Sequence, residues 1–237
     1  MVDTTVHIRP ADERGATELG WLSSRHSFSF GSYYDPGHMG FRSLRVINDD
    51  RVQAGQGFGT HPHRDMEIIS IVVDGALEHQ DSMGNGSVIR PGDVQRMTAG
   101  TGVTHSEFNP SPTDTVRFLQ VWIEPEARGL EPGYEQRTFD LESRRNRWVL
   151  VASREGRDGS LTVHQDVALF RAVIERGSQL VHRVADGRHL WVQMISGSVE
   201  LDRRELSAGD GAAVIGVDQL IVSGLAPVSD VLLFDLS

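Results

Sequence analysis

The chain of 237 residues contains no cysteine. This absence excludes disulfide bonds, thiolate metal sites, iron–sulfur clusters and a cysteine nucleophile. No apolar run approaches the roughly 18 residues that a transmembrane helix requires. The first residues, MVDTTVHIRPADERG, lack the apolar stretch of a secretory signal. A cytoplasmic location is therefore expected.

Positive charge is also scarce. The 23 Lys and Arg residues are outnumbered by 33 Asp and Glu, which gives a net charge of −10. An acidic chain without a basic block is not expected to bind nucleic acid directly. We expect no membrane contact either, and a monomer or a weak oligomer.

Helical periodicity is hard to find, and short β-rich runs take its place. Runs such as EIISIVVDG, VRFLQVWIE and VLLFDL are separated by Gly, Pro, Asp and Asn at spacings of about ten residues. This pattern predicts an all-β sandwich or barrel with little helix. The length is enough for one large all-β domain or for two domains of about 100 residues each.

A segment that begins near residue 71 resembles one that begins near residue 193. Both contain a strand, a tight turn, a second strand, a Gly-Asp turn and a third strand, so that Gly75 matches Gly197 and Gly92 matches Gly209. Coincidence is the alternative, because many β-hairpins share these turn residues. We expect a duplicated barrel with its joint in the polar stretch 124–147, and domains at residues 1–140 and 141–237.

The stretch GQGFGTHPHRDME places His61 and His63 on either side of Pro62. Alternate residues of a strand point to the same face, and a proline favours extended geometry in the residue before it. Both imidazoles therefore point the same way and could form half of a metal site. A chance pair is the alternative, since the chain has ten histidines.

A second pair with the same spacing, His105 and Glu107, lies in AGTGVTHSEF. Hairpin-type sequence separates the two pairs, so the strands that carry them can be neighbours in one barrel. Three imidazoles and one carboxylate suit Fe(II), Mn, Co, Ni, Cu or Zn, and leave one or two coordination positions open. Open positions are typical of a reactive site, whereas a structural zinc is usually closed by four ligands.

These stretches resemble known motifs. GQGFGTHPHRDMEIISIVVDG resembles the first cupin motif, and RPGDVQRMTAGTGVTHSE resembles the second. Together with HSFSFGSYYDPGHMGFRSLRVINDDRV and LEHQDSMGN, they resemble the pirin family. RDGSLTVHQDVALF, followed by a degenerate second cupin, is similar to the bacterial quercetinase-type branch of that family.

The resemblance implies two jelly-roll-like cupin domains in tandem. It also implies one divalent metal per chain, expected to be Fe(II), bound in the N-terminal half by His61, His63, His105 and Glu107. Mn, Co, Ni, Cu and Zn are compatible with the same ligands.

For several bacterial pirins, the resemblance further implies quercetin 2,3-dioxygenase activity. A small aromatic flavonol would react with O2, and its ring would open with loss of carbon monoxide. Glu107 would be the catalytic residue, because it lies next to the metal and can accept the proton of the 3-hydroxyl group. Two alternatives stay open: a non-catalytic metal-binding regulator that acts through a protein partner, and a metal-dependent cupin isomerase.

A further carboxylate, Glu67, lies at the position of the usual cupin ligand. It follows His63 by four residues and shares its face if the strand continues. The resemblance to pirins favours Glu107 as the ligand, which leaves Glu67 as a partner of a ligand histidine. The remaining histidines His79, His164 and His189 are expected to be surface or hydrogen-bonded residues.

The second domain is expected to bind no metal. In the repeat, the four candidate ligands correspond to Arg183, Ala185, Val222 and Gly224. His182 lies one residue from the first of these positions, and a slip of one residue turns a strand side chain to the opposite face. A shifted register would recover this histidine alone, and one histidine does not make a site.

Overall fold

The computed structural model describes residues 5–237, and most of its regular structure is β-strand. Helical structure in this range is limited to α1 (Leu141–Arg144) and the 3₁₀ turns η1 (Ala11–Glu13) and η2 (Arg157–Gly159). The all-β prediction is confirmed. No helix of the described range is long and apolar enough to cross a membrane.

The described chain folds into two compact units. The N-terminal unit consists of Gly15–Thr138 and the short segment Leu161–Gln165, and the remaining residues form the C-terminal unit. This division differs from the expected domains, 1–140 and 141–237, at two places. The described residues before Gly15 belong to the C-terminal unit, and Leu161–Gln165 belongs to the N-terminal unit. Strand β1 (Thr5–Arg9) pairs with β20 (Gly211–Ile215), and Val6 is buried in the core of the C-terminal unit. A short alternating strand does not indicate which sheet edge it will complete.

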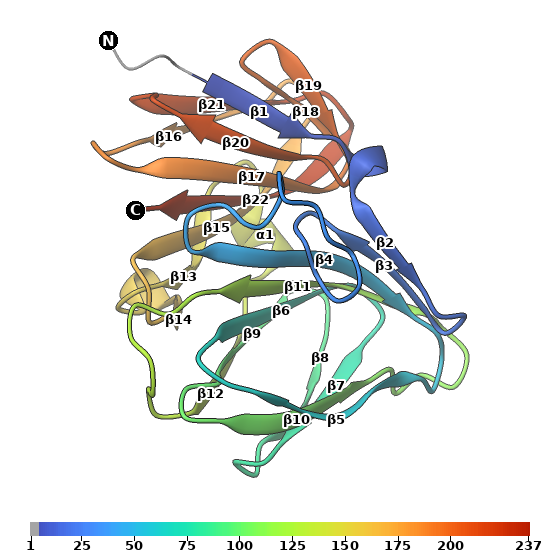
Figure 1. Ribbon diagram of the computed structural model, residues 1–237. Coiled ribbons are helices and arrows are strands. Elements are labelled where there is room, and N and C mark those ends of the chain that lie inside the picture. Colours follow the sequence, from blue (N-terminus) through green and yellow to red (C-terminus); the bar gives the residue numbers. More distant parts are fainter. Residues whose placement is uncertain (1–4) are drawn as a thin grey trace. The chain divides into compact units, whose positions relative to one another are not determined.

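Two sheets make up the N-terminal unit (Figure 1). The large sheet has the strand order β12-β9-β6-β11-β4-β3-β2, and the small sheet has the order β5-β10-β7-β8. The large sheet contains β2 (Gly15–Glu18), β3 (Leu22–His26), β4 (Leu44–Val52), β6 (Glu67–Asp74), β9 (Asp93–Thr98), β11 (Val116–Ile123) and β12 (Gly133–Thr138). The small sheet contains β5 (Gly57–His63), β7 (Leu77–Asp81), β8 (Gly86–Ile89) and β10 (Val103–Phe108). The two-residue strand β14 (Leu161–Thr162) lies in the segment Leu161–Gln165.

The C-terminal unit has a matching pair of sheets. Those strands of its large sheet that belong to this unit follow the order β1-β20-β17-β22-β15-β13, and its small sheet follows β16-β21-β18-β19. The large sheet contains β1, β20, β13 (Val149–Ser153), β15 (Val167–Glu175), β17 (His189–Ser196) and β22 (Val228–Leu236). The small sheet contains β16 (Gln179–Arg183), β18 (Ser198–Leu201), β19 (Arg204–Ser207) and β21 (Gln219–Gly224).

Matching glycines mark the internal repeat. Gly75 and Gly197 end β6 and β17 with φ of +78° and +74°, and Gly92 and Gly209 precede β9 and β20 with φ of +100° and +91°. These values lie in the region that glycine adopts without steric cost. The two units therefore turn at the same places, as the repeat in the sequence predicts.

An apolar cluster in the N-terminal unit holds its two sheets together. The cluster contains Leu22, Val52, Val72, Leu77, Ile89, Val116 and Phe118. Its members come from β3, β4, β6, β7, β8 and β11, and thus from both sheets. This packing fixes the small sheet over the large one, and so positions the side chains that the small sheet directs inward.

Candidate metal centre

The candidate ligands lie on two neighbouring strands of the small sheet. β5 and β10 are antiparallel, and His61 lies directly opposite His105. His63 lies two residues further along β5 on the same face. The ring centroids of His61 and His105 are 4.5 Å apart, and that of His63 is 4.8 Å from each of them. The three imidazoles thus converge as the spacing predicts.

The free nitrogen atoms of these rings face one another. The Nδ1 of His61 lies 2.8 Å from the carbonyl oxygen of Gly59, a contact in which the ring N–H donates and Nε2 is left with its lone pair. That Nε2 lies 3.0 Å from the Nε2 of His105. The Nε2 of His63 is buried and has no hydrogen-bond partner in the described chain. One ligand atom from each ring lies within 4.8 Å of the others, so the donor set fits a divalent transition metal.

Burial keeps two of these rings uncharged. It lowers the pKa of His63 to about 4, with the neighbouring His61 adding to the effect. Burial also lowers the pKa of His105 to about 2, and the surrounding imidazoles contribute. The neutral imidazole is the form that binds a metal, so protons compete little for these nitrogens near neutral pH.

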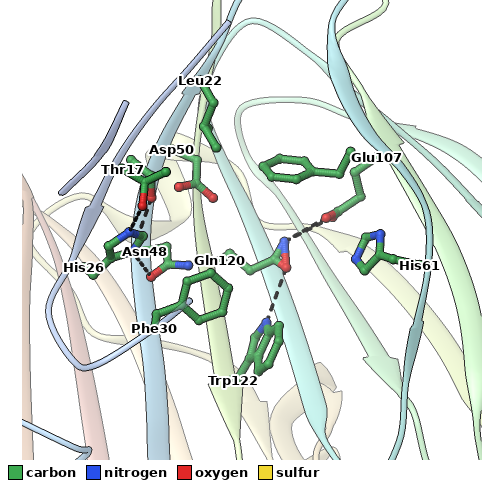
Figure 2. A pocket seen from close by; sticks show the side chains of 12 residues that line it. Thr17, Leu22, His26, Phe30, Asn48, Asp50, His61, Glu107, Gln120 and Trp122 are labelled. Atoms are coloured by element: carbon green, nitrogen blue, oxygen red, sulfur yellow. Dashed lines mark hydrogen bonds between the residues drawn. The ribbon is translucent and has the colours of Figure 1, made fainter. Parts of the chain in front are cut away.

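Glu107 lies beside His105 on the same face of β10. The hydroxyl of Ser70 donates to Oε1 at 3.1 Å. Nε2 of Gln120 donates to Oε2 at 3.0 Å, as Figure 2 shows. Burial raises the pKa of Glu107 to about 7, against these hydrogen bonds and together with the negative charge of Asp50. A carboxyl group with a pKa near neutrality is suited to accept and return a proton.

His79 extends the cluster on the far side of His105. A ligand atom of His79 lies within 4.8 Å of ligand atoms of His105 and Glu107. Its Nε2 contacts Asp81 at 3.2 Å, and its Nδ1 contacts Gln95 at 3.2 Å. His79 is hydrogen-bonded, as expected, but the sequence analysis did not predict that it lies next to the candidate ligand His105. The alternation of Leu77, His79 and Asp81 along β7 is the signal that could have revealed it.

The structure gives Glu67 different neighbours from those expected. β5 ends at His63, Asp65 turns the chain with φ of +49°, and β6 begins at Glu67 in the other sheet. The period of two therefore does not carry over from His63 to Glu67. The buried Glu67 carboxylate accepts from Thr98 at 3.1 Å and contacts His164 at 3.1 Å. The expectation that Glu67 supports a ligand histidine is wrong, because His164 is not among the candidate ligands.

A cavity opens next to the metal centre. Its enclosed volume is about 90 Å³, and the empty space amounts to about 460 Å³ when the part open to solvent is included. Figure 2 shows Glu107 and His61 on one side of this cavity and Asp50 and Asn48 on the other. The lining residues are Thr17, Leu22, Ser24, His26, Phe30, Asn48, Asp50, Phe58, His61, Glu107, Gln120 and Trp122. Aromatic and aliphatic walls with a few polar groups are suited to a flat organic molecule.

A row of polar residues crosses the large sheet beneath the site. The members lie opposite one another on β3, β4, β11, β6 and β9 and are called the polar row: His26, Asn48, Gln120, Ser70 and Gln95. All are at most 7% exposed. Gln120 and Ser70 hold Glu107, and Gln95 contacts His79. Sequence reasoning missed this row, although an isolated polar residue in an apolar strand is its signal.

The C-terminal unit contains no comparable cluster. Within residues 5–237, the groups of three ligand-type side chains that could hold a metal all come from the N-terminal unit. Along β16, Leu180 and His182 are more buried than the exposed Arg183. His182 is thus at an inward position, but its Nε2 is bonded to Asp235 at 2.7 Å.

Fold and site together define a class of protein with two β-sandwich units and, within residues 5–237, a histidine-rich candidate metal centre in the N-terminal unit. The pirin family model matches residues 7–123, and the model described as the quercetinase C-terminal cupin domain matches residues 150–236. The chain belongs to the pirin family, and its fold is a tandem of two cupin domains.

Similar proteins extend over nearly the whole chain. A quercetin 2,3-dioxygenase of Escherichia coli (strain K12) is 49% identical over 231 residues, which cover 98% of each chain. The crystal structure of the bacterial pirin YhhW from Escherichia coli in complex with nickel(II) has a TM-score of 0.93 at 47% identity, and covers 98% of this chain and 99% of that one. A quercetin 2,3-dioxygenase from Acinetobacter baumannii, 21% identical with a TM-score of 0.77, shares the fold over 94% of this chain and 83% of its own.

Proposed function

We propose that the chain is a metal-dependent dioxygenase that cleaves flavonols such as quercetin with O2. One observation carries the proposal: His61 and the buried Glu107, which each lie within ligand distance of His105, both line a cavity with aromatic walls. The quercetin 2,3-dioxygenase of Escherichia coli, 49% identical over 98% of its length, supports the choice of substrate class.

His61, His63, His105 and Glu107 would hold the metal, with Fe(II) as the expected ion. A bound metal supplies a Lewis-acidic template for the 3-hydroxyl and the neighbouring carbonyl group of a flavonol. Nickel, which is bound in the structure of YhhW, belongs to the group of metals that this donor set accommodates.

Glu107 would accept the proton of the 3-hydroxyl group. Its carboxylate lines the cavity within ligand distance of His105, so it is positioned to accept this proton from a flavonol bound there. Ser70 and Gln120 donate hydrogen bonds that fix its orientation. Phe30 and Trp122, whose ring centroids are 5.4 Å apart, would pack against the flat rings of the substrate and exclude water.

The test is a quercetin turnover assay on protein purified without chelator, with metal analysis of the same sample. Quercetin loss with equimolar O2 uptake, abolished by chelation and restored by metal, is the expected result. Stoichiometric metal without O2 uptake would contradict the proposal and favour a metal-binding regulator or an isomerase. The variant Ser111→Ala, which alters an exposed loop that does not line the cavity, is the control and should keep full activity.

A further inference from the structure

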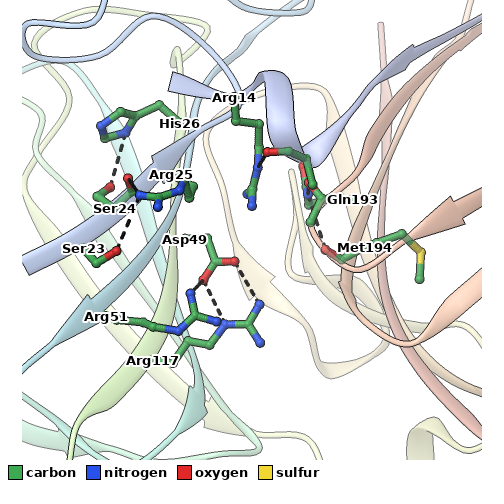
Figure 3. Close-up of polar contacts among 12 residues, drawn as sticks. Arg14, Ser23, Ser24, Arg25, His26, Asp49, Arg51, Arg117, Gln193 and Met194 are labelled. Atoms are coloured by element: carbon green, nitrogen blue, oxygen red, sulfur yellow. Dashed lines mark hydrogen bonds and ion pairs between the residues drawn. The ribbon is translucent and has the colours of Figure 1, made fainter. Parts of the chain in front are cut away.

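Two neighbouring carboxylates on β4 have opposite surroundings. Asp49 and Asp50 point to opposite faces of the strand. Arg117 donates to Asp49 through two hydrogen bonds of 2.9 Å each, as Figure 3 shows. Asp50 faces the cavity instead. Burial raises the pKa of Asp50, the hydroxyl of Ser24 lowers it, and the negative charge of Asp49 raises it further. An arginine thus balances the charge of one carboxylate, and no cation is among the groups that act on the other.

One oxygen of Asp50 is left open toward the cavity. The residue is 4% exposed, and its Oδ1 is buried without a hydrogen-bond partner in the described chain. A buried carboxyl oxygen without a partner is unfavourable, because it has given up its hydrogen bonds to water and gained none in return. Such an atom in a cavity that can hold an organic molecule indicates a hydrogen bond that the ligand completes.

The polar neighbours of Asp50 have their own partners. The ring of His26 contacts Asn48 Oδ1 at 2.8 Å through Nδ1 and Thr17 Oγ1 at 2.8 Å through Nε2. These bonds hold the three side chains in place in the wall that the large sheet forms. Figure 2 shows the Asp50 carboxylate between this group and Gln120, across the cavity from His61.

We propose that Asp50 binds a phenolic hydroxyl group of the substrate, at the wall of the cavity opposite His61. The assignment rests on the proposed function, and it narrows the substrate class to flavonols that carry a hydroxyl group beyond the 3-hydroxyl and carbonyl pair. A carboxylate accepts a hydrogen bond from a phenol, and a carboxylic acid can donate one to it. Phe30, Phe58 and Leu22 line the space between the two polar walls and would contact the rings of the substrate.

The proposal predicts discrimination between two ligands that share the same chelating groups. Quercetin carries additional phenolic hydroxyls, whereas 3-hydroxyflavone has none. A hydrogen bond from Asp50 to a phenolic hydroxyl contributes to the binding of quercetin, but it cannot form with 3-hydroxyflavone. Removal of that polar atom should therefore weaken quercetin binding and leave 3-hydroxyflavone nearly unaffected.

The experiment compares Asp50→Leu and Asp50→Asn with the unaltered protein in the metal-loaded form. Steady-state turnover and anaerobic flavonol titrations are measured with both ligands, and metal content and melting temperature are recorded. For quercetin, Asp50→Leu should raise KM and the dissociation constant by about 10- to 100-fold. For 3-hydroxyflavone, both should stay within about twofold. Asp50→Asn, which keeps a hydrogen-bonding group, should restore part of the preference for quercetin. Asp49→Asn, on the same strand but the opposite face, is the matched control and should leave the preference unchanged.

The outcomes distinguish a failure of the role assigned to Asp50 from a failure of the proposed dioxygenase function. Equal losses for both flavonols, or no loss for either, would overturn the role of Asp50 while the dioxygenase assignment stands. If the unaltered metal-loaded protein neither binds nor turns over either flavonol, the proposed function fails, and the assignment of Asp50 fails with it.

Discussion

The two units share one strand order but place opposite chemistry at equivalent positions. The strand register of the C-terminal unit puts an apolar residue at each position of the polar row, which gives an apolar row of Leu150, Phe170, Leu233, Val192 and Ala212. The repeat that matches Gly75 with Gly197 also matches Ser70 with Val192. The same backbone thus supports a reactive cavity in one unit and an aliphatic core in the other.

This difference shows where the N-terminal unit gives up stability for chemistry. Burial of a polar side chain is unfavourable unless hydrogen bonds compensate for it. The polar row bonds to Glu107, to His79 and among its own members, but Oε1 of Gln95 is buried without a partner in the described chain. In the C-terminal unit, a cluster of sixteen buried residues contains inward-facing members of both sheets, among them Val192 and Val222. Apolar contacts of this kind contribute about 25 cal/mol for each Å² removed from water.

The largest expected effect separates the histidines of the two units. His105→Ala should abolish stoichiometric metal binding and leave a folded β protein, because both units have apolar cores that do not depend on the ion. His182→Ala should keep full metal content, since His182 is bonded to Asp235 and lies outside the ligand cluster. Metal analysis and circular dichroism check both variants. Metal retained by His105→Ala, or lost in His182→Ala, would disprove the assignment of one site to one unit.

Next in size is the difference between the two buried glutamates. Glu107→Gln should lower kcat for quercetin by about 10²- to 10⁴-fold, the usual contribution of a general base, and weaken metal binding. Glu67→Gln should leave metal content intact and change kcat much less, since its partners are Thr98 and His164. Kinetics at saturating metal measure both effects. The reverse ranking would make Glu67 the carboxylate ligand, as in ordinary cupins.

Glu67 also marks the limit of what the sequence predicts. The all-β class, the repeat and the convergence of three histidines follow from local patterns: alternation, turn glycines and a spacing of two residues on a strand. The place of Glu67 depends on a break between β5 and β6 at Asp65, a non-glycine residue with φ of +49°. A positive φ at aspartate is uncommon, so the local sequence pattern does not predict this break in the strand.

The polar row shows a second limit of prediction from sequence: local patterns do not reveal which distant side chains will contact each other. Ser70 and Gln120 are fifty residues apart, and their common contact with Glu107 exists only once β6 and β11 are paired. Likewise, Asn and Asp side by side, as at Asn48, Asp49 and Asp50, are typical of turns, yet this tract lies within the buried strand β4. The strand accommodates these polar residues because its two faces have different surroundings. Asp49 pairs with Arg117 on one face, and Asn48 and Asp50 line the cavity on the other.

Asp50 allows a test of how much folding stability the polar cavity costs. The strand register places the buried Ala172, which carries no charge, at the equivalent position of the C-terminal unit. Burial raises the pKa of Asp50 from 3.8 to about 7. Between these values the unfolded chain binds fewer protons than the folded one, so stability should fall as pH rises, by up to about 1.4 kcal/mol per pH unit. Asparagine does not titrate, so Asp50→Asn should gain stability relative to the unaltered protein as pH rises from 4 to 7. Denaturant unfolding of the metal-free proteins measures the difference, and a constant difference across this range would contradict the prediction.

The smallest expected effect is the cost of a hydroxyl group in the apolar row. Val192→Thr preserves side-chain shape but buries a hydroxyl between Leu233 and Ala212, which offer no side-chain acceptor. An unsatisfied buried hydroxyl should cost about 1–3 kcal/mol, and thus lower the melting temperature by a few degrees without changing metal content. Val181→Thr makes the same change at a half-exposed position on β16 and should stay within about 0.5 kcal/mol of the unaltered protein. If both variants unfold at the same temperature, the core of the C-terminal unit tolerates polar groups, and the contrast between the two rows does not reflect a difference in packing.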